Sequence, residues 1–204
     1  MADSAAEICN LALSHLGVAE EVADMENEEE VSEVKSACLR YYDTALKQTL
    51  RAFHWPFAKK TATLTEVEED PSDEWQFSYA YPGDCLAARR IVSGYRNETR
   101  QSRIAYHIGQ DNTYGRLIFC DLEDAKLEYT LLVEAEAHYP DDFVMAFSFL
   151  LAFYMANRLV AGDNRRRDAM WASYQLEMSQ ARANAANEEQ VDEEVQSEAV
   201  RARD

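Results

Sequence analysis

The sequence predicts an α+β protein, a mainly helical four-helix bundle with a strand-rich insertion between its second and third helices. Apolar residues recur at helical spacing in two segments before residue 58 and in two segments after residue 139. Between these segments, apolar and polar residues alternate as in strands, and turn-forming residues separate the runs. Because helices and strands occupy separate parts of the chain, an alternating βαβ fold is not expected.

The first two helices precede residue 58. Ser4 and Glu7 form a capping-box pattern, and apolar residues then recur until Gly17, which predicts a short amphipathic helix. A long second helix follows the acidic run 20–33 and should end at Trp55-Pro56, because proline disfavours helical geometry in the residue before it. Its predicted core stripe consists of Val34, Cys38, Tyr41, Tyr42, Ala45, Thr49 and Phe53.

The middle of the chain reads as strands and turns. Residues 57–67 alternate as an extended segment, and Phe77, Tyr79 and Tyr81 alternate up to a Pro-Gly-Asp turn at 82–84. Residues 85–92 continue as an apolar strand or a short turn of helix. Further strands are expected within 93–121 and 126–135, joined by polar turns.

The third helix is expected in 143–160, FVMAFSFLLAFYMANRLV, which is apolar on nearly every face. A helix without a polar side lies either in a core or in a membrane. Its unbroken apolar part, 143–156, is shorter than the roughly 20 residues that cross a bilayer. We therefore expect a buried central helix, with Pro140 in its first turn and Gly162 as its stop.

The fourth helix is expected after Asp163 and Asn164, which can cap its start. Its predicted amphipathic stripe consists of Met170, Trp171, Tyr174, Met178 and Ala181. The basic cluster Arg165, Arg166 and Arg167 occupies the first turn, where positive charge opposes the helix dipole. Such a cluster is either solvated or paired within the chain, or it contacts another molecule.

These elements divide the chain into four regions. Residues 1–58 hold the N-terminal helices, 59–138 the strand-rich insertion, 139–186 the C-terminal helices and 187–204 an acidic tail. The tail has too few apolar residues to build a core, so we expect a partner to order it.

Composition excludes several functional classes. The net charge of -18 argues against binding DNA by phosphate neutralisation, which needs clustered lysine and arginine. The four cysteines, at 9, 38, 85 and 120, lack a CxxC spacing, so we expect buried, reduced thiols rather than zinc or redox chemistry. The acidic start of the chain does not resemble a secretory signal, which favours synthesis and retention in a cytoplasm.

No motif for catalysis is present in the sequence. It contains no GxxxxGK[ST], GxGxxG, HExxH or GxSxG pattern, and its histidines are isolated, so neither an enzyme nor a cofactor or metal is predicted. The acidic run 20–33 alternates somewhat as a calcium loop does, but it lacks the glycine of the sixth loop position. His15, without a second histidine four residues away, is expected to be packed or on the surface.

Three motifs carry a resemblance to a known family. ICNLALSHLG at 8–17, LRAFHWPFAKK at 50–60 and YAYPGDCLAARRI at 79–91 together resemble the tailed-phage head-to-tail adaptors, or connectors, related to tail tubular protein A. The resemblance covers the N-terminal half; the C-terminal helices match only in kind and the acidic tail matches no family motif. The residues on or beside the family pattern are Leu13, Leu16, Gly17, Trp55, Phe57, Ala58, Tyr81, Pro82, Asp84, Cys85 and Leu86.

The resemblance implies a structural virion protein that is assembled in the host cytoplasm. Identical subunits, commonly twelve, would form a ring between the portal protein and the tail nozzle protein. The ring would seal the packaged genome and form part of the ejection channel, through which DNA passes without specific binding. An acidic channel wall would favour sliding, although solubility alone also explains the charge.

Two contacts are hypothesised for this ring, in which the flanks of the bundle pack against neighbouring subunits and the insertion points toward the tail. Arg165, Arg166 and Arg167 would lie at an acidic subunit boundary. The portal would contact the C-terminal tail through Asn187, Val191, Val195, Val200, Arg201 and Arg203. The main alternative is an acidic DNA mimic that inhibits a host DNA-binding protein, and a metal-dependent enzyme is a weaker one.

Overall fold

The computed structural model describes residues 4–27, 32–68, 74–95, 101–161 and 163–188. The helices are α1 (Ala5–Leu16), α2 (Glu33–Ala52), α3 (Asp141–Leu159) and α4 (Asn164–Glu188), with short 3-10 turns η1 (Pro56–Ala58) and η2 (Glu136–His138). The strands are β1 (Lys59–Thr63), β2 (Phe77–Ala80), β3 (Cys85–Ile91), β4 (Tyr106–Asp111), β5 (Gly115–Cys120) and β6 (Lys126–Leu131). Gly162, expected to end α3, lies outside the described residues.

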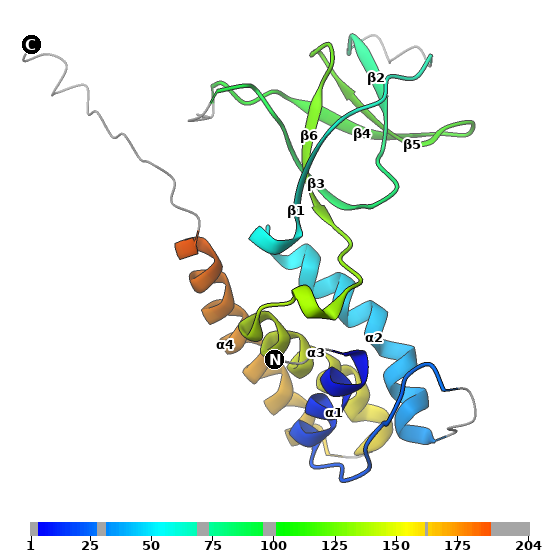
Figure 1. Ribbon diagram of the computed structural model, residues 1–204, viewed down its shortest axis with the longest axis vertical. Coiled ribbons are helices and arrows are strands. Elements are labelled where there is room, and N and C mark those ends of the chain that lie inside the picture. Colours follow the sequence, from blue (N-terminus) through cyan, green and yellow to red (C-terminus); the bar gives the residue numbers. More distant parts are fainter. Residues whose placement is uncertain (1–3, 28–31, 69–73, 96–100, 162, 189–204) are drawn as a thin grey trace, which may run out of the picture.

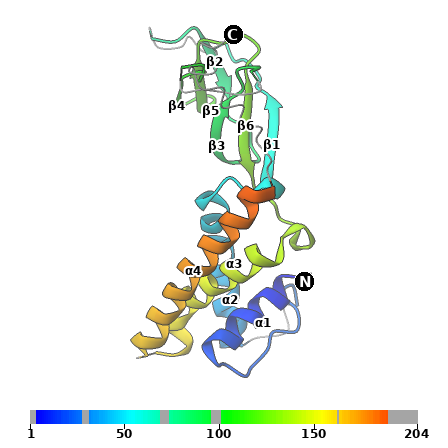
Figure 2. The ribbon, with the colours of Figure 1, turned by 90° about the vertical axis from the view of Figure 1, so that its left-hand side faces the viewer.

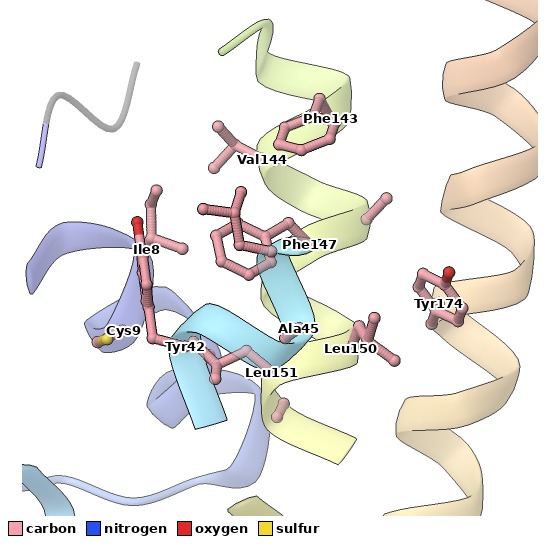
Figure 3. Close-up of a cluster of buried hydrophobic side chains, with 14 of the residues drawn as sticks. Ile8, Cys9, Tyr42, Ala45, Phe143, Val144, Phe147, Leu150, Leu151 and Tyr174 are labelled. Carbon is pink, nitrogen blue, oxygen red and sulfur yellow. The ribbon is translucent and has the colours of Figure 1, made fainter. Parts of the chain in front are cut away.

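Helix α3 is the centre of the helical part. Helices α1, α2 and α4 each pack against it (Figures 1 and 2). Side chains from all three helices lie around its buried residues (Figure 3). Phe143, Phe147, Leu150 and Leu151 are fully buried. By length and hydropathy α3 could also cross a membrane, but more than half of it is covered by protein. The prediction of a buried central helix is confirmed.

The predicted fold class, a helical bundle with a central strand insertion, is wrong. The strands form two three-stranded antiparallel sheets, ordered β1-β6-β3 and β2-β5-β4, which have a hydrophobic core of their own. The helices are not a four-helix bundle either, because α1, α2 and α4 surround α3 and pack mainly on it. Helical periodicity shows that a face is apolar but does not show which element it meets.

The two sheets share one core beyond the C-terminal end of α2 (Figures 1 and 2). Strand β6 lies between β1 and β3, and β5 lies between β2 and β4. Tyr79 from one sheet and Tyr129 from the other belong to this core, and each is about 1% exposed. The Tyr79 hydroxyl donates a hydrogen bond to the Leu122 carbonyl at 2.7 Å. The β part is therefore a second packed unit on the end of the helices.

Local sequence explains the helix ends. The Ser4 hydroxyl accepts a hydrogen bond from the Glu7 amide at 3.3 Å, and Gly17 ends α1 with φ of 67°, a left-handed conformation that suits glycine. Ser32 caps α2 in the same way as Ser4 caps α1, by accepting from the Lys35 amide. The expected cap of α4 is also present, since the Asp163 carboxylate accepts from the Arg166 amide at 3.0 Å.

An aromatic cluster holds the start of α3. The ring of Phe143 lies 5.2 Å from that of Trp55, 4.9 Å from that of Phe57 and 5.1 Å from that of Tyr139. Edge-to-face contacts of this kind add to the free energy of burial. These contacts therefore fix the segment between α2 and β1 onto the start of α3.

Replacing Phe147 by alanine tests the central position of α3. Phe147 is fully buried and packs edge-on against Tyr42 with ring centres 5.1 Å apart, so we expect a loss of about 3–5 kcal/mol in the free energy of unfolding. Leu176→Ala is the control, because Leu176 is 58% exposed and its loss should change stability by less than about 0.5 kcal/mol. Urea denaturation measures both, and equal losses would contradict the packing.

Candidate functional site

The C-terminal end of α2 is joined to the β part by Arg89. From β3, the Arg89 guanidinium donates to the Arg51 carbonyl at 3.1 Å and to the Phe53 carbonyl at 2.7 Å. Its Nε donates to the Thr130 hydroxyl at 2.8 Å. The last carbonyls of a helix lack partners within the helix and carry partial negative charge, so a cation is favourable there. Burial lowers the pKa of Arg89, and the neighbouring charge of Arg51 lowers it further.

The same helix end is also tied to α4 and to the corner that follows it. Arg182 of α4 donates to the Ala52 carbonyl at 3.1 Å, and the Trp55 indole donates to the Thr49 carbonyl at 3.0 Å. Residues far apart in the sequence thus satisfy the carbonyls of one helix turn. We call the carbonyls of residues 49–53, together with their donors Arg89, Arg182 and Trp55, the α2 junction.

Beside the α2 junction, on the outer face of the sheet β1-β6-β3, basic side chains surround the buried carboxylate of Glu128. Glu128 is 8% exposed and forms a bidentate ion pair with Arg90, whose guanidinium donates to the two carboxylate oxygens at 2.9 and 3.0 Å. His54 Nε2 lies 3.4 Å and Lys59 Nζ lies 4.0 Å from the same carboxylate. Burial would raise the pKa of Glu128, but the hydrogen bonds from Arg90 and the charges of Lys59, Arg90 and His54 outweigh it, so the pKa lies below its usual value.

A bulge in β3 places two consecutive arginines on this face. Ala88 is paired with Tyr129 and Arg90 with Glu128, so the register gains one residue at Arg89. In a regular strand Arg89 and Arg90 would point to opposite faces, but the extra residue interrupts that alternation. Arg89 reaches Thr130 and Arg90 reaches Glu128, which lie on one face of β6. The sequence gives no signal of this bulge.

The motif residues of 50–60 and 79–91 lie around the α2 junction. Trp55 and Ala58 are buried, and Phe57 packs on Phe143. In the turn 82–84, the Asp84 carboxylate pairs with Lys60 of β1 and accepts from the Tyr129 hydroxyl of β6 at 2.8 Å.

The remaining motif residues of this turn are held by its neighbours. The Leu86 carbonyl accepts from Arg51 at 3.1 Å. The Cys85 amide donates to the Pro82 carbonyl at 3.0 Å, which closes the turn. The ring of Tyr81 lies 3.9 Å beneath the Arg116 guanidinium. These motif residues therefore fix how the helices are joined to the sheets.

The motif of 8–17 lies at the other end of the helical part, together with the basic cluster. Leu13 and Leu16 are buried, and Arg166 donates to the Leu16 carbonyl at 2.6 Å while its guanidinium lies over Gly17. Arg166 thus caps α1 within the chain. Arg167 pairs with Asp168 at 3.0 Å and Arg165 is exposed. A role of this cluster at a subunit boundary stays a prediction.

A groove runs along α3 between α2 and α4. Its volume is about 420 Å³, and it is lined by Gln48, Phe153, Tyr154, Arg167, Asp168 and Trp171. Trp171, expected in the core stripe of the fourth helix, is 40% exposed. Its ring lies 5.2 Å from that of Phe153 and 5.3 Å from that of Tyr174. Helical spacing could not distinguish the groove from the core, because both lie against α3.

Other candidate residues have structural surroundings. His15 stacks on Phe149 with ring centres 3.9 Å apart and lies 3.1 Å from the Ser148 hydroxyl, and burial lowers its pKa. The four cysteines are buried and unbridged. Among the residues that the structure describes, no group of three or more histidine, cysteine or acidic side chains could hold a metal ion.

Of the expected portal-contact residues, only Asn187 is described, in the last turn of α4. Val191, Val195, Val200, Arg201 and Arg203 lie outside the described residues. No protein-family model matches the chain, and no curated protein matches it significantly. Function is therefore inferred from the residues and their geometry.

Replacing Glu128 by glutamine tests the cationic face. A carboxyl whose pKa is lowered in the folded state stabilises the protein above its unfolded pKa, near 4.5, and this stabilisation is lost as pH falls through the folded pKa. At pH 7 we expect Glu128→Gln to lower the free energy of unfolding by about 2 kcal/mol, through loss of charged hydrogen bonds. The difference from wild type should shrink as the pH falls below about 4.

The exposed carboxylate of Glu123 provides the control. Glu123→Gln should change stability by less than about 0.5 kcal/mol at either pH. Urea denaturation at several pH values measures all three proteins. A Glu128→Gln loss that is equally large at neutral and acid pH would show that the cations do not stabilise the ionised carboxylate.

Proposed function

We propose that the protein is a structural virion component, a head-to-tail adaptor that forms a ring between the portal and the tail nozzle. The observation that carries this proposal is the position of the adaptor-like motifs. Those of 50–60 and 79–91 surround the α2 junction, where hydrogen bonds join α2, α4 and the sheets. They act as parts of a scaffold, as expected for a protein whose task is assembly.

The groove along α3 supports contact between subunits. Trp171, Phe153 and Tyr154 give it an aromatic lining, and the pair Arg167–Asp168 forms part of its rim. Protein interfaces are typically rich in aromatic residues, and a few of these account for most of the binding free energy. In our proposal a second copy of the chain covers this groove in the ring.

The charge of the chain supports passage of DNA. A net charge of -18 repels phosphates, so a channel built from such subunits would let a duplex slide without holding it. The proposed partners are other copies of the chain, the portal and the nozzle. The proposed role needs neither catalysis nor a cofactor, and the ring would be assembled in the host cytoplasm.

Trp171→Asp tests the proposed subunit contact. The change places a charge in the groove without removing a buried side chain, so the fold should survive while ring assembly on the portal weakens by about a hundredfold or more. Tyr95→Asp is the matched control, because Tyr95 is 70% exposed and lies outside the groove. Sedimentation velocity of each variant mixed with portal measures assembly, and circular dichroism checks the fold.

Normal assembly of Trp171→Asp would show that the groove is not a subunit boundary. If wild type itself stayed small with portal but bound a host DNA-binding protein in competition with DNA, the adaptor proposal would fail. The DNA-mimic alternative would then account for the acidic charge.

A further inference from the structure

A basic pocket lies on the β part, next to the α2 junction. Its volume is about 290 Å³, and it is lined by Arg89, Arg90, Ile91, Arg103, Ile104 and Tyr106. The antiparallel bridge between Ile91 and Ile104 joins β3 to the segment before β4, and both isoleucines line the pocket. Three arginines thus meet in one place in a chain of net charge -18.

The pocket is suited to carboxylates on a partly apolar segment. Arg89 is fixed by the α2 carbonyls and Arg90 by Glu128, so two of the guanidinium groups are held in place before any ligand arrives. The third lining arginine, Arg103, is exposed. Guanidinium groups match the planar carboxylate, and the isoleucines and Tyr106 offer apolar contact beside them.

We propose that residues 189–200 of the same chain bind in this pocket. From 189 to 200 the segment has no lysine or arginine, and its acids are Glu189, Asp192, Glu193, Glu194 and Glu198. Val191 and Val195 stand between the acids. This mixture complements a pocket of arginines, isoleucines and a tyrosine.

The end of α4 brings the segment within reach. Arg182 donates to the Ala52 carbonyl, and Arg89 donates to the carbonyls on either side of it, so α4 passes close to an arginine of the pocket. The helix continues from Arg182 to Glu188, six residues or about 9 Å along its axis, and ends beside the junction (Figures 1 and 2). Ten extended residues then span about 33 Å, so no second chain is required.

This contact goes beyond the proposed adaptor function and does not depend on it. The portal contact hypothesised above uses the same segment, so the two contacts exclude each other in one chain. If the chain is an adaptor, portal has to displace the segment from the basic pocket before it can bind the segment itself.

Cleavage of the tail by a glutamate-specific protease tests this inference in the full-length chain. Docking should protect the bonds after Glu193, Glu194 and Glu198, which mass spectrometry follows individually. Arg103→Glu leaves the helix cap and the Glu128 pair in place, and we expect it to speed cleavage by about tenfold at low salt. Arg40→Glu, a change at another exposed arginine, in the first half of α2, is the control and should not alter the rate.

The cleavage rate is also measured as a function of salt concentration and of protein concentration. In wild type, cleavage should accelerate between about 0.05 and 0.5 M NaCl, and Arg103→Glu should respond much less. Contact within one chain predicts that protection survives dilution by about a hundredfold. Equal cleavage of wild type and Arg103→Glu would overturn the inference, and protection that is lost on dilution would overturn it in favour of contact between chains.

Discussion

The structure depends on the burial of α3. From Phe143 to Ala156 this helix has almost no polar side chain on any face, so no orientation lets one side meet water. Each fully buried phenylalanine or leucine adds about 1.5–3 kcal/mol relative to exposure, and α3 buries several. The apolar faces of α1, α2 and α4 supply the cover, since each of these helices packs on α3.

The second constraint is that the last backbone carbonyls of α2 have no hydrogen-bond donors within the helix. Carbonyls that the helix cannot pair accept hydrogen bonds from Arg89, Arg182 and Trp55, which come from β3, α4 and the corner after α2. Because these carbonyls need hydrogen-bond donors, the core of the helices and the core of the sheets are joined at the end of α2. The bulge in β3 makes this possible because it adds Arg89 to the face that already carries Arg90.

Much of the local structure could be predicted from the sequence. Ser4 and Gly17 lie at the ends of α1, as predicted, and the segments of β1 and β6 alternate as strands do, because these signals act over a few residues. Helix α2 ends at Ala52, three residues before the end predicted at Trp55-Pro56. The arrangement of helices around α3 and the separate core of the sheets were missed, since periodicity does not choose a neighbour.

The candidate sites were harder to predict than the elements. Trp171 has core spacing but lines a groove, because whether α2 and α4 meet over α3 is a matter of tertiary packing. Arg89 and Arg90 looked like ordinary strand residues, and only the register of β3 with β6 shows them on one face. Arg166 opposes the dipole of α4, which is visible in the sequence, but its acceptor, the Leu16 carbonyl, lies 150 residues away.

The central functional claim is that this scaffold assembles into a ring on a portal. The most direct measurement is the mass of the protein in solution, alone and after mixing with portal, by light scattering. We expect a large complex of many copies with portal, whether the chain alone is a monomer or an already formed ring. A chain that stays a monomer or dimer at every concentration, with or without portal, would contradict it.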